Sequence, residues 1–441
     1  MLKTFNLRGN PLTPGRPSAE VLAALDRHWR PRYLLIAPHR LGFFLAMVVL
    51  MVSSVWWALV QLDRVSVAVV LPYTASPTLV HAAVMTFGFM PLFFTGFLFT
   101  AAPKWLRVEP LEARALLVPL LLQAGGWLLW VSGIHIHMFM VLAGLTLALS
   151  GLARITWLFW RLVWRSAESD RLHARTVGVA CLVGCISLGG LLANLVLGAT
   201  TVAMACVLTG LWGFVVVVFV TVAHRMIPFF TSNAMPFITA WRPFWALGVM
   251  LAAAVFEAVT VWVELDGPLR GPMAHFWMLA RGGFELVAGG VLLWLAQVWG
   301  LTQSLKNRLL AMLHFGFLWL GLALALGGAA QILGLLQDAP VLSLGSLHAL
   351  TMGCLGSLML AMVTRVSCGH SGRAQVADRI AWTLFWLVQL ATLLRITAAA
   401  QSTWASWLLL PTAMIWAGTM AVWGTRLANW YGRLRPDGRP G

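Results

Sequence analysis

The chain has 441 residues, of which 60% are hydrophobic and only 10% are charged. Its mean hydropathy of +0.84 lies above that of soluble globular domains, in which about a quarter of the residues are charged. These values exclude a soluble enzyme or a soluble nucleic-acid-binding domain, and they indicate an integral membrane protein. The formal net charge of +16 would suit an anionic partner such as nucleic acid. The positions of the basic residues show whether the charge instead reflects orientation in the membrane.

Twelve apolar runs follow one another along the chain, each of about 20 residues or more, which is the length that a helix needs to cross a hydrocarbon layer. We therefore predict an all-α polytopic membrane protein, a bundle of about twelve transmembrane helices. Residues 1–38 are expected to form an N-terminal tail, residues 39–431 the transmembrane domain, and residues 432–441 a C-terminal tail. The runs begin near residues 41, 78, 113, 136, 176, 202, 243, 274, 309, 343, 379 and 404.

The basic residues lie mainly in every second loop. If the N-terminus is cytoplasmic, that side receives nearly all of the loop lysines and arginines, and only Arg64 and Arg270 lie clearly on the opposite side. Such a bias satisfies the positive-inside rule for membrane proteins. We therefore predict that both termini are cytoplasmic, and that most of the net charge reflects orientation and not a nucleic-acid partner.

Two predicted helices begin with the same pattern. The segments "HAAVMTFGFM" at 81–90 and "HALTMGCLGS" at 348–357 each open with a histidine, carry Met at the fifth position and continue with small residues. The topology places His81 and His348 at similar depth on the external side. Imidazole is a common axial ligand of haem iron, and a haem held between two helices needs one histidine from each. We predict that this pair ligates a haem; for each histidine alone, the alternative is an interfacial side chain with one nitrogen in water.

Three other histidines fall at external helix starts, namely His135, His137 and His275. On a regular helix, residues two apart point about 200° away from each other, so His135 and His137 cannot face one metal there. We therefore favour two exposed interfacial histidines over a copper site at this segment.

Charged residues inside predicted spans form a second group of candidates, because such residues are costly in a membrane. Arg281 and Arg395 lie in the same external half as the histidine pair, and a guanidinium group suits the carboxylates of haem propionates. The alternative for Arg281 is an ion pair with Glu285, one turn away. Glu257 remains a proton carrier or a partner of Arg154, and the sequence does not choose between these roles.

The cytoplasmic side has histidines of its own. In "HRMIPFFTSNAMP" at 224–236, Pro228 is predicted to end the helix. His314 and His370 lie at similar depth, the latter in a predicted loop, "TRVSCGHSGR" at 364–373. These histidines would form a second, cytoplasmic cluster, or else a set of interfacial turns.

The segments 81–106, 224–234, 313–321 and 348–373 resemble the NnrS family, in the same order and at similar spacing. This resemblance implies a twelve-helix protein of the bacterial inner membrane that contains haem, here expected as haem b, and copper. It also implies a link to denitrification and to tolerance of nitric oxide. Within the segments that carry it, His81, His348, His314 and His370 are the expected metal ligands.

One segment departs from the family pattern. Many members begin the second helix with His-Ala-His-Glu-Met, whereas this chain reads "HAAVM", with Ala83 and Val84 in place of the second histidine and the glutamate. One expectation is therefore that this protein binds haem but not copper. The pairing of a histidine on the second helix with one on the tenth is also similar in layout to the haem-copper oxidase and nitric oxide reductase superfamily.

Together these features predict a haem-binding and copper-binding membrane protein of nitric oxide metabolism or nitrosative stress response, with a redox or sensing role. Its expected partners are the lipid bilayer, haem and nitric oxide, without nucleic acid. One alternative is a small-solute transporter or channel, since the intramembrane arginines and glutamates would line a path. Another is a non-catalytic membrane assembly factor, because no catalytic set of acid, base and nucleophile is evident; the sequence leaves open whether the protein is an enzyme.

Overall fold

A computed structural model describes residues 28–66, 69–267, 269, 271–342, 344–400 and 402–437. Most of the predicted N-terminal tail, part of the C-terminal tail and Arg270 therefore lie outside the described residues. The described part of the chain is helical and contains no strand. Twelve of its helical stretches are long and apolar enough to span a membrane, which confirms the predicted all-α polytopic class.

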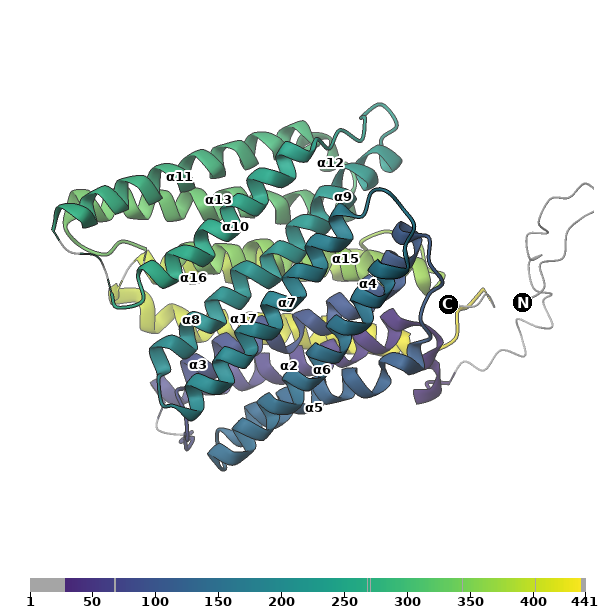
Figure 1. Ribbon diagram of the computed structural model, residues 1–441, viewed down its shortest axis with the longest axis horizontal. Helices are drawn as coiled ribbons and strands as arrows, with labels where there is room; N and C mark the ends of the chain where they lie inside the picture. Colours follow the sequence, from purple (N-terminus) through teal and green to yellow (C-terminus); the bar gives the residue numbers. More distant parts are fainter. Residues whose placement is uncertain are drawn as a thin grey trace, which may run out of the picture.

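The predicted spans agree closely with the observed ones. The largest difference between an expected and an observed first residue of a span is four residues. It occurs at the fifth span, which was expected to begin near residue 176 and begins at Leu172. The helices run roughly along one direction and form a bundle (Figure 1). In chain order the elements are η1 Pro31–Ile36, α2 Pro38–Val65, α3 Pro77–Ala83, η2 Val84–Gly88, α4 Met90–Leu106, η3 Ala113–Leu116, α5 Leu117–Gly133, α6 Met138–Arg165, α7 Leu172–Val196, α8 Thr200–Gly210, η4 Leu211–Val216, α9 Val217–Ala234, α10 Phe244–Val263, α11 Pro272–Val298, α12 Leu301–Ser304, α13 Arg308–Gln337, α14 Gly345–His348, η5 Ala349–Gly356, α15 Ser357–His370, α16 Arg379–Ala400 and α17 Ser402–Tyr431.

Three spans contain an internal π-helical segment, and these are the second, sixth and tenth. The segments are η2, η4 and η5; η4 and η5 are continuous with an α-helix on both sides, whereas Phe89 separates η2 from α4. Together with α13, these three spans are the most buried of the bundle. Single π turns inside α-helices are rare and frequently mark functional sites. The repeated sequence pattern coincides with two of them, because His348 directly precedes η5 and His81 lies three residues before η2.

The first and last spans pack against each other and close the bundle. The backbone N–H of Arg30 donates to the carbonyl of Gly432 at 2.8 Å, and the buried Arg40 side chain donates to the carbonyls of Tyr431 and Arg433 at 3.3 and 2.7 Å. The two ends of the described chain therefore lie at the same end of the bundle, which we call the terminal end. The opposite end, where α3 and α14 begin, is the His81 end. The cytoplasmic location of the terminal end stays a prediction.

Two helix ends differ from the sequence-based expectation. Pro228 was expected to end its helix, but α9 continues to Ala234 with this proline inside it. The turn beyond the proline is held by the Thr231 hydroxyl. It donates to the carbonyl of Ile227 in the same helix and also makes a tertiary contact with His314. Likewise α15 extends to His370, so that this histidine ends a helix and does not lie in a loop.

Glycines let the first two spans approach at backbone distance. A Cβ atom added to Gly42 of α2 would stand 2.8 Å from the Cα and N atoms of Gly96 in α4 and 2.9 Å from the carbonyl oxygen of Leu92. All three are backbone atoms, which cannot rotate away as a side chain can. Small residues at such crossings are typical of helix packing in membranes. Gly96 therefore serves helix packing.

We expect Gly42→Ala to destabilise the protein by about 1–3 kcal/mol, because the two helices must separate to admit the methyl group. Thermal unfolding in detergent, followed by circular dichroism, measures this as a lower midpoint. The matched control is Gly125→Ala in α5, where an added Cβ meets no atom within 4 Å. Equal midpoints for the two variants would contradict the tight α2–α4 contact.

Candidate functional site

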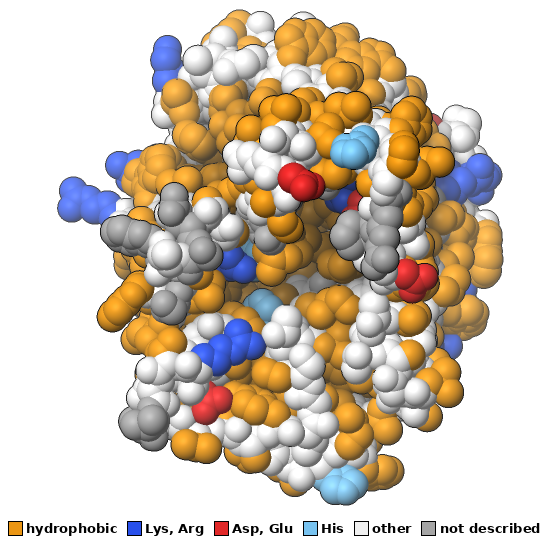
Figure 2. Space-filling model, turned by 90° about the vertical axis from the view of Figure 1, so that its left-hand side faces the viewer, with side chains coloured by type: hydrophobic (Ala, Val, Ile, Leu, Met, Phe, Trp, Pro, Cys, Tyr) orange, Lys and Arg blue, Asp and Glu red, His pale blue; other side chains and the backbone are white. Residues whose placement is uncertain are grey.

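The predicted histidine pair lies at the His81 end, on α3 and α14. Figure 2 looks onto this end of the molecule and shows that its centre is hollowed, with basic and histidine side chains among the hydrophobic ones around the hollow. His81 and His348 are both partly buried. The site is therefore built where two of the interior spans begin, and not on the lipid-facing surface.

The ring of His81 is held by a stack of side chains. It lies on the indole of Trp57 from α2, with ring centroids 3.8 Å apart and planes at 15°. The guanidinium of Arg64 lies over the same indole at 5.2 Å and donates to the Thr78 hydroxyl at 3.1 Å. The buried Nδ1 atom of His81 has no hydrogen-bond partner. The ring is thus fixed in orientation while one of its nitrogens stays unpaired.

The loop between α2 and α3 positions this histidine. Asp63, at the end of α2, accepts hydrogen bonds from the Leu71 backbone N–H at 3.1 Å and from the Tyr73 hydroxyl at 2.6 Å. Burial, together with this bond to Asp63, raises the pKa of the Tyr73 phenol above its usual range, so the phenol stays protonated and donating. Thr74 adds two bonds to the carbonyl of Ile134. Hydrogen bonds at Leu71, Tyr73 and Thr74 therefore hold the loop in place just before α3 begins.

The hydrogen bonding of His348 determines its tautomer. Its Nδ1 atom lies 2.8 Å from the carbonyl oxygen of Leu344, one turn earlier. A carbonyl only accepts, so Nδ1 carries the hydrogen and the Nε2 atom is left with a lone pair. This arrangement is typical of histidines that ligate metals, in which the second nitrogen is held by a carbonyl or carboxylate.

His81, His348 and Arg395 form one electrostatic group. The charged and titratable groups that act on His81 are His348, Arg395 and Arg64, and Arg395 also acts on His348. Arg395, on α16, is partly buried and forms no ion pair or hydrogen bond with any described residue. A partly buried guanidinium without a carboxylate is a position at which an anionic group would be stabilised. The structure thus gathers three of the predicted site residues.

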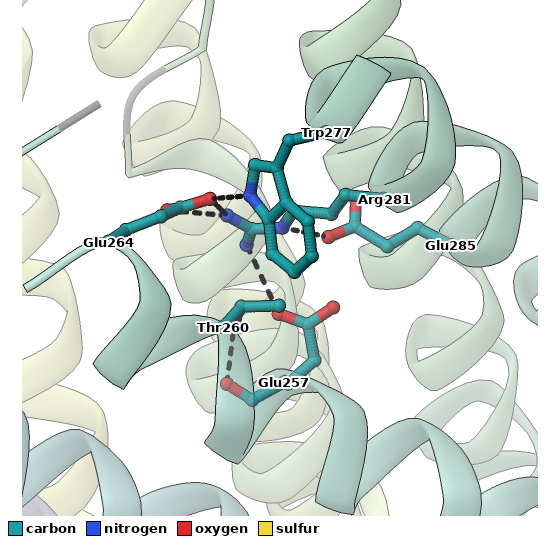
Figure 3. Close-up of polar contacts among 6 residues, drawn as sticks. All are labelled: Glu257, Thr260, Glu264, Trp277, Arg281 and Glu285. Atoms are coloured by element: carbon teal, nitrogen blue, oxygen red, sulfur yellow. Dashed lines mark hydrogen bonds and ion pairs between the residues drawn. The ribbon is translucent and has the colours of Figure 1, made fainter. Parts of the chain in front are cut away.

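The fourth, Arg281, is engaged by three carboxylates. Figure 3 shows its guanidinium between Glu257, Glu264 and Glu285, at 3.1, 2.7 and 2.7 Å respectively. The predicted alternative for Arg281, a pair with Glu285, is confirmed. Glu257 also binds Arg281, whereas Arg154 instead lies 4.2 Å over the ring of Trp157.

Glu264 was not singled out from the sequence. It lies seven residues after Glu257, which on a helix places both side chains on one face, and this spacing was the available indication. Trp57 and Arg64 were also missed as site residues, since stacking between spans leaves no pattern in a single sequence.

The histidines of the terminal end form separate contacts and not one cluster. The Nε2 atom of His314 lies 2.9 Å from the Thr231 hydroxyl, which already donates its hydrogen to a carbonyl, so Nε2 is the donor there. The buried Nδ1 atom of His314 is left without a partner. His370 instead contacts the ring of His39, with centroids 4.3 Å apart. The cations Lys104, Arg435 and Arg40 act on His370, a setting unfavourable to a further cation.

His224 belongs to a third group that the sequence did not reveal. Its Nε2 atom donates to the carbonyl of Pro243 at 3.1 Å, so its Nδ1 atom accepts from Nε2 of His173 at 3.0 Å. Both rings are buried. This chain of hydrogen bonds joins α7, α9 and the segment before α10, and it accounts for both histidines as structural residues.

No three His, Cys, Asp or Glu side chains within the described ranges are arranged to hold a metal ion. His135 is occupied by the Trp56 indole N–H at 2.7 Å and by the carbonyl of Pro72 at 2.7 Å. His137 caps α6 by accepting from the backbone N–H of Phe139. These two rings have different partners. Neither lies on a regular helix, because residues 134–136 form a turn and His137 is the extended N-cap of α6, so helical spacing does not account for this difference; the copper site stays a prediction without a candidate ligand set.

Comparison with known proteins gives one match that covers nearly the whole chain. The family model described as "NnrS protein" matches residues 33–435. No curated protein matches the chain.

We expect Thr231→Val to destabilise the protein by about 1–3 kcal/mol, because it removes the acceptor of the buried His314 N–H. The measurement is the thermal midpoint in detergent. Thr397→Val is the matched control, since the Thr397 hydroxyl is exposed and donates only to the carbonyl of Leu393 in its own helix. The contact between α9 and α13 would be unimportant if both variants unfolded at the wild-type temperature.

Proposed function

Because the chain belongs to the NnrS family, we propose that this membrane protein serves nitric oxide metabolism or the nitrosative stress response by binding haem b between His81 and His348. The observation that carries the proposal is the pair itself: two histidines from different interior spans at one end of the bundle, near enough for the charge of one to act on the other. We further propose that the membrane is the bacterial inner membrane. Copper is not part of the proposal.

The residues present fit a haem in three respects. His348 has its Nε2 lone pair free for iron because its other nitrogen is bonded to a carbonyl. His81 has a buried nitrogen without a partner, a costly arrangement that a bound group would relieve. Arg395 is a basic side chain without a carboxylate partner, suited to a haem propionate. Arg281, the other predicted propionate ligand, is already saturated by glutamates.

If both His81 and His348 held the haem, it would supply a redox-active iron suited to electron transfer or sensing more than to catalysis at the iron. The chain's own contribution is orientation. The Leu344 carbonyl keeps the His348 tautomer, and Trp57 holds the plane of the His81 ring. Arg395 is partly buried, which strengthens its electrostatic effect on a bound carboxylate compared with a fully exposed arginine.

We expect the purified full-length protein to show the absorption bands of six-coordinate haem b. His81→Ala and His348→Ala should each abolish or strongly shift these bands, because each removes one axial ligand. Arg395→Gln should keep the spectrum but weaken haem retention roughly tenfold, the value of one charge-assisted hydrogen bond. Absorption spectra and the haem-to-protein ratio measure these effects.

The control variant is His275→Ala, which removes an exposed histidine from the same end of the bundle. It should leave both spectrum and haem content unchanged. Wild-type protein without haem bands, or unchanged bands in both ligand variants, would overturn the proposal. Solute uptake by proteoliposomes of such haem-free protein would favour the transporter alternative.

A further inference from the structure

The glutamates around Arg281 differ sharply in exposure. Glu264, at the C-terminal end of α10, has 32% of its side chain exposed, whereas the side chains of Glu257 and Glu285 are 5% and 3% exposed. Arg281 lies between them with 17% exposed. The cluster therefore runs from the wet edge of the His81 end into the interior of the bundle (Figure 3).

The two buried carboxyl groups are incompletely paired. Each gives one oxygen to Arg281, while Oε1 of Glu257 and Oε2 of Glu285 are buried and receive no hydrogen from any other described group. Both carboxyl groups bind the same guanidinium, so two ionised groups would repel each other beside it. Ionised carboxylates have only acceptor oxygens, so a proton on one of the two groups would supply the donor that these unpaired buried oxygens lack.

The charge balance supports a single proton. Glu264, at the edge, can remain ionised in contact with water. In the interior, one guanidinium faces two carboxyl groups, which leaves one negative charge in excess if both are ionised. An uncompensated charge inside a membrane is costly, and one bound proton brings this interior group to neutrality.

We infer that Glu257 and Glu285 form a proton-binding site, in which the two carboxyl groups share one proton beside Arg281. The charged groups acting on the pair are Arg281 and the carboxylates themselves. Glu264 binds the same guanidinium and is 32% exposed, so the cluster reaches water at the His81 end through this carboxylate.

The inner side of the site faces the segment that carries His348. A Cβ atom at Gly327 of α13 would stand 2.7 Å from Oε2 of Glu285 and 3.6 Å from Cβ of Ser346, two residues before His348. The glycine therefore leaves room for the carboxyl group to reach α14. Delivery of the proton to a group bound at His348 rests on the proposed function; the proton-binding site itself does not.

Infrared spectroscopy of the full-length protein tests the inference without any haem. We expect wild-type protein at neutral pH to show the carbonyl stretch of a protonated carboxylic acid, shifted to lower frequency in D2O. Raising the pH should remove this band reversibly while the helical amide band persists. This measurement needs no variant, and a wild-type protein without such a band at neutral pH would overturn the inference.

Variants assign the band to the pair. In Glu257→Gln or Glu285→Gln, the remaining carboxyl group pairs with Arg281 alone and ionises, so the band should be lost. In Glu264→Gln, Arg281 loses one partner and stabilises the ionised pair more strongly, so the band should disappear at lower pH than in wild type. Glu112→Gln, on an exposed loop, is the control and should leave the band unchanged. A band that survived in both Glu257→Gln and Glu285→Gln would overturn the inference.

Discussion

The absence of water from the hydrocarbon layer is the constraint on which the rest of this structure depends. Backbone groups satisfy it within helices, and many buried polar side chains satisfy it with a partner from another span or with a carbonyl of their own helix. Arg281 is surrounded by carboxylates, Arg40 by backbone carbonyls and His314 by a threonine hydroxyl. Against this background, a buried group without a partner is informative. Among the described residues, His81, Glu257 and Glu285 have such atoms towards the His81 end, and His173 and His314 have them towards the terminal end.

The π segments show how regular helices are adapted to build an interior. A π turn holds an extra residue, so the side chains that follow are rotated relative to an uninterrupted α-helix. The wide turns are packed with aromatic rings. Phe87 of η2 stacks on Phe214 of η4 and lies against Gly210, and Trp319 of α13 lies against Gly353 of η5. The three segments sit on spans four apart in the chain, which gives the second, sixth and tenth spans related shapes around the centre.

The sequence predicted the spans well because hydropathy over about 20 residues is a local property. It also predicted the grouping of His81 with His348, because topology places equivalent helix starts at one depth. It did not predict η5 or the continuation of α9 past Pro228, because both depend on contacts with other spans. The partner of a buried group is equally nonlocal. Arg281 was expected to bind a haem propionate or Glu285; Glu257 is an additional partner, because only the packing of α10 on α11 brings it to Arg281.

The contact between the first and last spans bears on how the protein is made. The polar groups that satisfy Arg40 are carbonyls of Tyr431 and Arg433, which leave the ribosome after every other span has been synthesised. Until then, the inward face of α2 lacks its final neighbour α17, and Trp416 of that helix has not yet reached Ser54. The bundle therefore closes only after α17 has been synthesised, and until then a nascent chain exposes the inward face of α2 to the insertion machinery.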